Sequence, residues 1–263
     1  MKKKTIIFYF SASGNSLYVA KNVARTMENV SLVCIAEAAD DKAYKYEGYE
    51  KVGFIMPLYF MSMPKMVGDF IERLELKDTR YVFSITTRAY SKGKIFKDMS
   101  FILAKKGIRL NYGRYITYPD SYIRWAGPVK EEVRQGIYIQ SDKNLEVFNK
   151  EILQEKNFIE KEGVILRTFA WFVYKIWKSR LSKNSKSFKV NENCISCSIC
   201  KNTCPARNIE LKEGLPIWSN KCEDCMACVQ HCPQKAIVFN KKTNQKERYM
   251  HPQITLNELL HKH

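Results

Sequence analysis

The sequence has 263 residues, more than an average domain but few for three domains, so we expect two. Lys and Arg outnumber Asp and Glu by 44 to 27, and this formal charge of +17 suits nucleic acid or an anionic membrane surface as a partner. The apolar run at residues 6–10 is shorter than the roughly 7–15 residues of a signal peptide, and no stretch approaches the ~18 apolar residues of a transmembrane helix. We therefore expect a cytoplasmic protein with reduced thiols.

The first half of the chain alternates between strand and helix patterns. Helix patterns begin after Gly14 and cover residues 64–74, 95–106 and 144–161. Strands that alternate with helices predict an α/β fold, with a doubly wound parallel sheet of five strands in the order 2-1-3-4-5. The five predicted strands are residues 5–10, 31–35, 52–56, 81–86 and 112–117.

A turn rich in hydroxyls follows the first strand and leads into the first helix. Such a turn presents backbone amides and a helix dipole to a phosphate. It contains neither the G-x-x-x-x-G-K-[ST] nor the G-x-G-x-x-G pattern, and a serine-rich helix cap is the alternative interpretation. Its form resembles the flavodoxin phosphate loop. The residues are Ser11, Ala12, Ser13, Gly14, Asn15 and Ser16.

Two further loops should reach the same edge of the sheet, since ligands of such folds bind at the carboxyl ends of the strands. Residues 57–63 carry Tyr59 and Phe60, and residues 87–93 carry Tyr90. These aromatic side chains are placed to stack on an isoalloxazine ring, although Tyr59 and Phe60 could instead pack beneath their loop.

The segment between the fifth strand and the cysteine-rich end contains two notable stretches. Residues 118–143 form a long excursion, which could be functional or could cover the sheet edge. Residues 164–181 form a basic amphipathic helix, which we expect to be buried between domains and not to lie on a membrane. Residues 182–187 suggest a flexible linker. Cys34 is expected in the core.

Eight of the nine cysteines form two runs, 28 residues apart, with the pattern C-x2-C-x2-C-x3-C-P. Bacterial ferredoxins use this spacing, with three cysteines of one run and the fourth of the other on each 4Fe–4S cluster. The first cysteine set is then Cys194, Cys197, Cys200 and Cys232, and the second cysteine set is Cys222, Cys225, Cys228 and Cys204.

Zinc and disulfides are the competing interpretations of these cysteines. Structural zinc usually takes separated pairs of C-x2-C, whereas three cysteines fall within seven residues here. Disulfides require an oxidising compartment. His231 adjoins Cys232 without the spacing of a ligand, so we expect it outside the ligand set.

The chain resembles the flavodoxin–ferredoxin fusions of anaerobic bacteria and archaea, in which a flavodoxin-like domain precedes a small α+β two-cluster ferredoxin domain. The resemblance implies an FMN-binding domain (1–162), a connecting helix and linker (163–187), a ferredoxin domain (188–240) and a tail (241–263). FMN would contact the 11–16 turn and two loops, although residues 87–93 lack the glycine-rich or acidic character common there. The loop contacts would be Pro57, Tyr59, Phe60, Thr87, Arg88 and Tyr90.

The function that follows is single-electron transfer between two 4Fe–4S clusters and FMN. Tyr122, Arg124 and Trp125 of the excursion would line the route between them. A flavin-dependent reductase of a small substrate is the alternative, and a zinc-bearing nucleic-acid binder rests on charge alone. Cluster and phosphate charges bring the net charge nearer to about +11, which suits an acidic redox partner. We expect neither nucleic acid nor a membrane surface as a partner.

Overall fold

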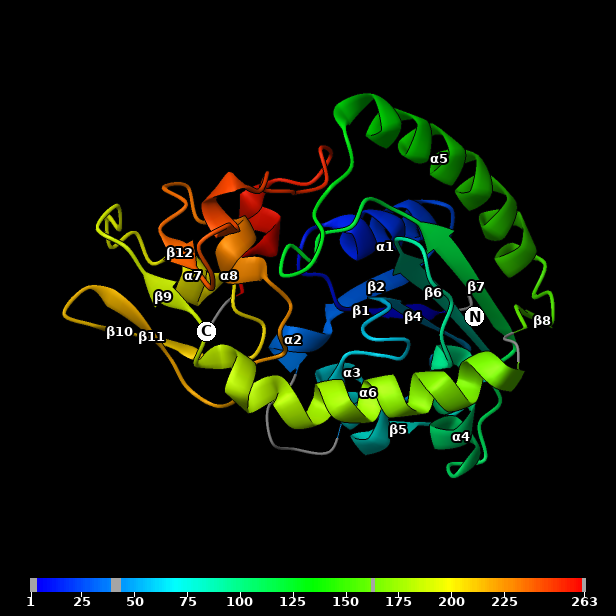
Figure 1. Ribbon diagram of the computed structural model, residues 1–263. Coiled ribbons are helices and arrows are strands. Elements are labelled where there is room, and N and C mark those ends of the chain that lie inside the picture. Colours follow the sequence, from blue (N-terminus) through cyan, green and yellow to red (C-terminus); the bar gives the residue numbers. More distant parts are fainter. Residues whose placement is uncertain (1–3, 39–43, 162–163, 262–263) are drawn as a thin grey trace.

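The computed structural model describes residues 4–38, 44–161 and 164–261 (Figure 1). Its centre is a parallel sheet with the strand order β2-β1-β4-β6-β7-β8. The predicted order of five strands is confirmed, and a sixth strand of two residues, β8, extends the β7 edge. The strands are β1 (Thr5–Tyr9), β2 (Val30–Cys34), β4 (Lys51–Pro57), β6 (Tyr81–Arg88), β7 (Tyr112–Thr117) and β8 (Phe158–Ile159). A separate parallel pair, β3 (Tyr44–Tyr46) with β5 (Leu74–Leu76), was not predicted.

Helices cover both faces of this sheet and bury its apolar strands (Figure 1). One face packs against α1 (Asn15–Arg25) and α5 (Glu131–Leu153). The other packs against α2 (Ile35–Ala38), α3 (Lys65–Arg73) and α4 (Ile95–Ala104). Because both faces are buried, the carboxyl ends of the strands remain as the place for a ligand.

The last helix of the sheet domain differs from its prediction at both ends. α5 begins at Glu131 and ends at Leu153, whereas the pattern indicated 144–161, so the irregular excursion is shorter than expected. Glu131 and Glu132 lie in the first turn of α5, where acidic side chains favour the helix dipole. The pattern missed the first half of α5 because that half does not show the apolar periodicity of a packed helix: its apolar residues Val133 and Ile139 are exposed.

The cysteine-rich region is a small domain of short elements around its own core. Strand β9 pairs antiparallel with β12, and β10 pairs antiparallel with β11. Cys200, Cys204 and Cys228 are members of the buried core, alongside Ile209 and Val229. The elements are β9 (Lys189–Val190), α7 (Ile199–Asn202), β10 (Ile209–Lys212), β11 (Leu215–Trp218), α8 (Ala227–Gln230) and β12 (Ile237–Val238).

The helix α6 (Val164–Ser185) extends from the sheet domain to the cysteine-rich domain (Figure 1). It continues through most of the predicted 182–187 linker, so the linker prediction was wrong there. Trp177 and Leu181 are buried, as expected for a bracket between domains. The predicted burial of Phe169, Phe172 and Ile176 was wrong, because these side chains face solvent; those of Ile165 and Leu166 lie outside the described residues.

The C-terminal tail packs back onto the sheet domain. Ile254 and Leu259 join the core beneath α1, and Leu259 belongs to the 3-10 helix η2 (Leu256–Leu259); η1 (Thr243–Gln245) precedes it. Within the described residues, none of the helices is long and apolar enough to span a bilayer.

Candidate functional site

A cavity of about 530 Å³ lies at the carboxyl ends of β1, β4 and β6. All the predicted flavin-contacting residues except Gly14 line it. The excursion adds Pro119, Asp120, Tyr122 and Trp125, α6 adds Phe169 and Val173, and the cysteine-rich domain adds Asp224. The sequence indicated Tyr122 and Trp125 but missed the contribution of α6 and of Asp224.

The turn after β1 forms the closed end of this cavity. Ser11, Ser13 and Ser16 are buried, and the hydroxyls of Ser16 and Thr87 are hydrogen-bonded at 2.8 Å. Gly14 occupies the N-cap of α1 with a φ of 95°, and its amide donates to Ser11 Oγ at 3.2 Å. Because glycine has no side chain to cap the helix, the first amides of α1 are left for an anionic ligand. The turn fits an FMN phosphate.

The tail and the cysteine-rich domain hold this turn from outside. The amide of His251 donates to the Ser13 carbonyl at 2.9 Å, and the Tyr249 hydroxyl donates to Asn15 Oδ1 at 2.7 Å. His231 Nε2 lies 2.7 Å from the Ala12 carbonyl oxygen. These contacts place His231 and the tail beside the phosphate turn, which no local sequence pattern indicated.

Phe60 of the 57–63 loop lies between the cavity and helix α6. Phe60 lines the cavity and also stacks on Trp177 of α6, with ring centroids 4.9 Å apart and an interplanar angle of 12°. Tyr122 and Trp125 meet the same Phe60 ring edge-on at 5.3 and 5.1 Å. We call Phe60, Tyr122, Trp125 and Trp177 the aromatic cluster. Its members Phe60, Tyr122 and Trp125 line the cavity, and their rings offer a π surface that suits a planar ring system.

The side chains of the 87–93 loop contact the cavity less closely than those of the 57–63 loop. Tyr90 lines it while remaining 68% exposed. The Arg88 guanidinium donates to the Tyr90 carbonyl at 2.6 Å and lies 5.7 Å from the centre of the Tyr115 ring. Arg88 is thus tied to its own loop.

Each cysteine set surrounds a cavity of its own. The first set, including Cys232 from the second run, lines one cavity together with Pro216 and Pro233. The second set, including Cys204 from the first run, lines another with Phe188 and Trp218. Crossed ligation would require this grouping, and four thiols around an apolar cavity fit a 4Fe–4S cluster.

The backbones of the two cysteine runs repeat one another. Left-handed residues recur 28 positions apart, as Ser196 with Asp224, Ser198 with Met226, and Arg207 with Lys235. The amide of Asn208 donates to Cys204 Sγ at 3.3 Å, and its counterpart Ala236 donates to Cys232 Sγ at 3.2 Å. The two runs therefore share one unusual backbone conformation and matching N–H···S bonds.

Burial disfavours the charged thiolate form of the cysteines in both sets. Burial raises the pKa of Cys200 to about 11 and that of Cys222 to about 12. A thiol of this kind becomes a thiolate when it coordinates a metal ion. Each set has buried cysteines, Cys200 in the first and Cys204 and Cys228 in the second, and the exposed Cys197 belongs to the first set.

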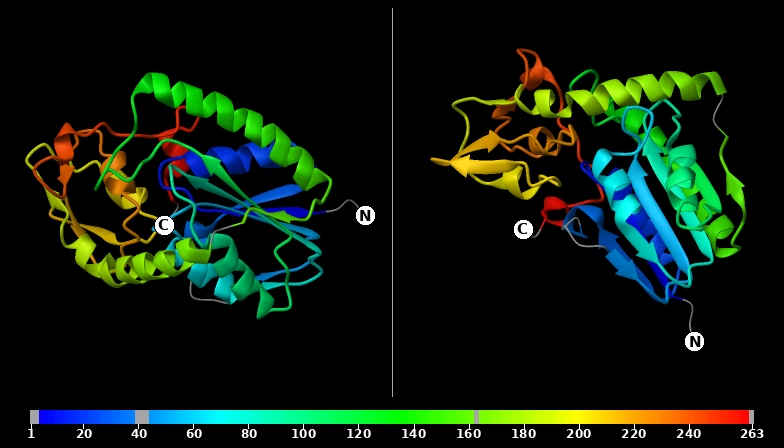
Figure 2. Two further views of the ribbon diagram at one scale, coloured as in Figure 1. Left: turned by 45° about the vertical axis from the view of Figure 1, so that its right-hand side comes forward. Right: turned by 90° about the horizontal axis from the view of Figure 1, so that it is seen from below.

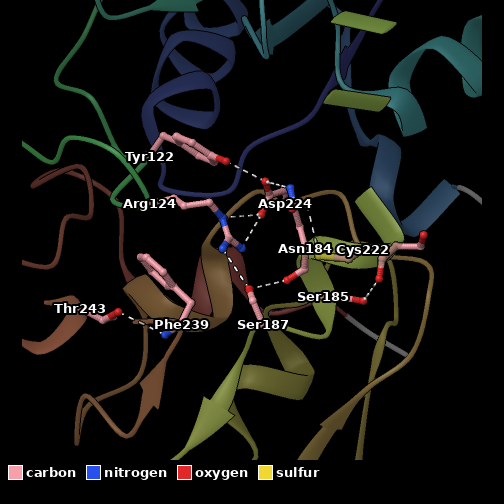
Figure 3. A network of polar contacts seen from close by, with 10 residues as sticks. Tyr122, Arg124, Asn184, Ser185, Ser187, Cys222, Asp224, Phe239 and Thr243 are labelled. Atoms are coloured by element: carbon pink, nitrogen blue, oxygen red, sulfur yellow. Dashed lines mark hydrogen bonds and ion pairs between the residues drawn. The ribbon is translucent and has the colours of Figure 1, made fainter. Parts of the chain in front are cut away.

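Asp224 connects the second cysteine set with the 530 Å³ cavity through a network of polar contacts, and Figure 3 shows this network. Its side chain is fully buried, and Oδ1 accepts from Arg124 Nη2 at 2.9 Å. Oδ2 accepts from the Tyr122 hydroxyl at 2.7 Å and from Asn184 Nδ2 at 2.8 Å. The amide of Asp224 donates to Cys222 Sγ at 3.3 Å. A single residue therefore contacts the aromatic cluster, the end of α6 and a predicted cluster ligand.

Comparison with known families agrees with this division of the chain. A flavodoxin domain model matches residues 6–108, and a 4Fe–4S dicluster domain model matches residues 193–237. The chain joins a flavodoxin domain to a 4Fe–4S dicluster domain. The first kind of domain suggests FMN as a cofactor, and the second suggests iron–sulfur clusters.

Two curated relatives each match a short part of the chain. A component of an ion-translocating oxidoreductase complex from Methanosarcina acetivorans is 51% identical over 45 residues, which cover 17% of each chain. A ferredoxin from Pyrobaculum islandicum is 39% identical over 62 residues, which cover 22% of this chain and 57% of the ferredoxin. The matched segments thus cover less than two thirds of either relative's length.

Solved structures resemble the flavodoxin domain weakly. General stress protein 14 from Treponema denticola, in complex with FMN, is 8% identical with a TM-score of 0.40, covering 56% of this chain and 98% of its own. A flavoprotein from Lactobacillus acidophilus, also with FMN, is 16% identical with a TM-score of 0.33, covering 43% and 93%.

Proposed function

We propose that this chain passes single electrons between two 4Fe–4S clusters, held by the first and second cysteine sets, and an FMN held in the 530 Å³ cavity. The observation that carries the proposal is Asp224, which lines that cavity and donates its amide to Cys222 Sγ. When bound, the clusters supply one-electron chemistry and the flavin supplies one- or two-electron chemistry.

The residues proposed to hold FMN are the 11–16 turn and the two loops beside it. The buried turn and the uncapped α1 N-terminus would bind the phosphate. Phe60 is fixed by its stack on Trp177, so it offers a rigid edge to the ring system. The dicluster domain supports the phosphate turn through His231 and the Ala12 carbonyl.

The difference in exposure between the cysteine sets suggests the direction of the relay. Cys197 and Ile195 are exposed, and Ile195 is 60% exposed. The second set instead adjoins the cavity, because Asp224, which donates its amide to Cys222 Sγ, lines that cavity together with Tyr122. We expect a redox partner to meet the first set, and the net positive charge favours a partner with acidic residues. Joining the sites in one chain replaces a bimolecular encounter by an intramolecular one.

One observation favours a second candidate, a flavin-dependent reductase of a small substrate. α6 and the excursion place Phe169, Val173 and Trp125 around the cavity, a wall that comes from outside the flavodoxin loops. Asp120 also lines the cavity, and burial raises the pKa of its carboxyl group. A carboxyl group of this kind could donate a proton to a reduced substrate.

Anaerobic purification with quantification of iron, sulfide and flavin tests the proposal. We expect about eight irons, eight sulfides and one FMN per chain, and visible absorbance that bleaches with dithionite. A colourless protein with about two zinc ions per chain would overturn it.

A further inference from the structure

The outer face of α6 is apolar although it faces solvent. Phe169, Trp171, Phe172 and Ile176 are 61, 46, 55 and 51% exposed. The opposite face buries Ala170, Trp177 and Leu181 against the rest of the molecule. A helix at the surface of a globular protein normally carries polar residues on its outer side, so an exposed row of large apolar residues indicates a binding surface.

The charges on this helix have one sign. The sequence of Val164–Ser185 contains no Asp or Glu, and its second half carries Lys175, Lys178, Arg180 and Lys183. The Lys175 ammonium lies 4.7 Å from the centre of the Trp171 ring, so cation and aromatic residue share one side of the helix. On the exposed side of α5, by comparison, Glu146 and Lys143 mix both signs.

The position of α6 leaves this face accessible. The helix lies along the outside of the molecule, over the sheet domain and the dicluster domain (Figure 2). Phe169 also lines the mouth of the flavin cavity, where Tyr90 and Trp125 are 68 and 73% exposed. The apolar face therefore continues into a rim of exposed aromatic residues.

We propose that α6 lies on an anionic membrane surface, with Phe169, Trp171, Phe172 and Ile176 at the boundary between headgroups and acyl chains. Apolar and aromatic side chains next to lysines, without acidic residues, are the combination by which interfacial helices bind anionic lipids. Exposed Trp and Tyr residues at the cavity mouth suit the same interface. This proposal reverses the expectation from the sequence, which favoured burial of this face. It goes beyond electron transfer and does not depend on it.

Flotation of the complete, cofactor-loaded chain with vesicles tests the proposal. One set of vesicles contains phosphatidylcholine alone and the other contains added phosphatidylglycerol. We expect flotation with the second set, weakened by salt, and little with the first. The double variant Phe172→Gln/Ile176→Gln should remain in the soluble fraction, and each of Lys175→Gln and Lys178→Gln should lower the bound-to-free ratio by about fivefold.

The chain offers a matched control on α4. Phe101 is 64% exposed, and the Lys105 ammonium lies 4.4 Å from its ring centre, as Lys175 does over Trp171. Phe101→Gln should float like the wild type, and iron and flavin content should be equal in all variants. Absence of flotation with phosphatidylglycerol, or equal effects of the α4 and α6 variants, overturns the proposal. So does a loss of self-association in the α6 variant, since a second copy would then cover this face.

Discussion

Arg124 and Asp224 form an ion pair at 2.9 Å across the junction between the excursion and the second cysteine set (Figure 3). The Asp224 side chain is fully buried and that of Arg124 is 14% exposed. Arg124 also donates to Ser187 Oγ at 2.9 Å and lies over the Phe188 and Phe239 rings. Because its partners satisfy both charges, the pair can persist out of water.

Asp224→Asn should destabilise this junction. The substitution keeps the size of the side chain but leaves the Arg124 charge without its partner, which typically costs about 3–5 kcal/mol for a buried pair. We expect a lower urea midpoint for the loss of dicluster absorbance. Glu210→Gln, an exposed acid on β10, is the control and should leave the midpoint unchanged. Equal midpoints for the two variants would refute the structural role of Asp224.

Cys204→Ser should remove a ligand of the second set although Cys204 belongs to the first run. We expect about four of eight irons to remain, with an electron paramagnetic resonance signal different from that left by Cys197→Ser. Cys34→Ser is the control, because Cys34 is buried and lines neither of the two cysteine cavities. If Cys204→Ser and Cys197→Ser leave the same signal, the crossed ligation is wrong.

Gly14→Ala should lower the free energy of unfolding by more than the backbone strain of alanine at a positive φ. A Cβ at Gly14 would lie 3.0 Å from the Cβ of His251, and its φ of 95° disfavours alanine. Gly107 has a φ of 70° and open space around it, so Gly107→Ala measures the backbone effect alone, about 1–2 kcal/mol.

FMN titration of flavin-free protein separates the two glycine variants. We expect weaker FMN binding for Gly14→Ala, because the tail displaced from the turn no longer supports it, and unchanged binding for Gly107→Ala. Equal changes in stability and in FMN affinity would show that the contact with His251 has no effect.

His251 should make the docking of the tail sensitive to pH. Burial lowers the pKa of His251 to about 4, below the value of about 6.5 expected in the unfolded chain. The unfolded chain therefore binds more protons between these values, so stability falls as pH falls from about 6.5 to 4, by about 3 kcal/mol from this residue.

His251→Gln should remove this part of the pH dependence. The measurement is urea unfolding of both proteins at several pH values from 7 to 5. At each pH, protection of the tail amides from hydrogen exchange is followed as urea is added, and the midpoint is compared between the two proteins. The difference between the proteins isolates His251, because burial lowers the pKa of His231 in both. Parallel pH profiles would contradict the assignment.

Local patterns predicted the parts of this molecule that depend on local sequence. The cysteine spacing predicted that Cys232 lies with the first set and Cys204 with the second, and the two cavities are lined in this way. Alternating strands and helices predicted the order of the sheet through β7. Both features are encoded within short stretches of chain.

The remaining features depend on contacts between distant residues. Asp224 links the second cysteine set to the excursion because Tyr122 and Arg124, about 100 positions earlier, donate to its carboxylate. The Cys222–Cys225 spacing did not indicate these contacts. The inner and outer faces of α6 are both apolar, so the pattern could not tell which one packs. The burial of Ala170, Trp177 and Leu181, with Trp177 stacked on Phe60, shows which face packs.

Electron transfer within one chain tests the central claim most directly. The loaded protein is mixed anaerobically with a reductant that reacts at the exposed first set, and bleaching of cluster and flavin absorbance is followed at several protein concentrations. We predict flavin reduction that follows cluster reduction with a first-order rate independent of protein concentration, and slower in Asp224→Asn. A rate that rises in proportion to protein concentration would contradict the relay.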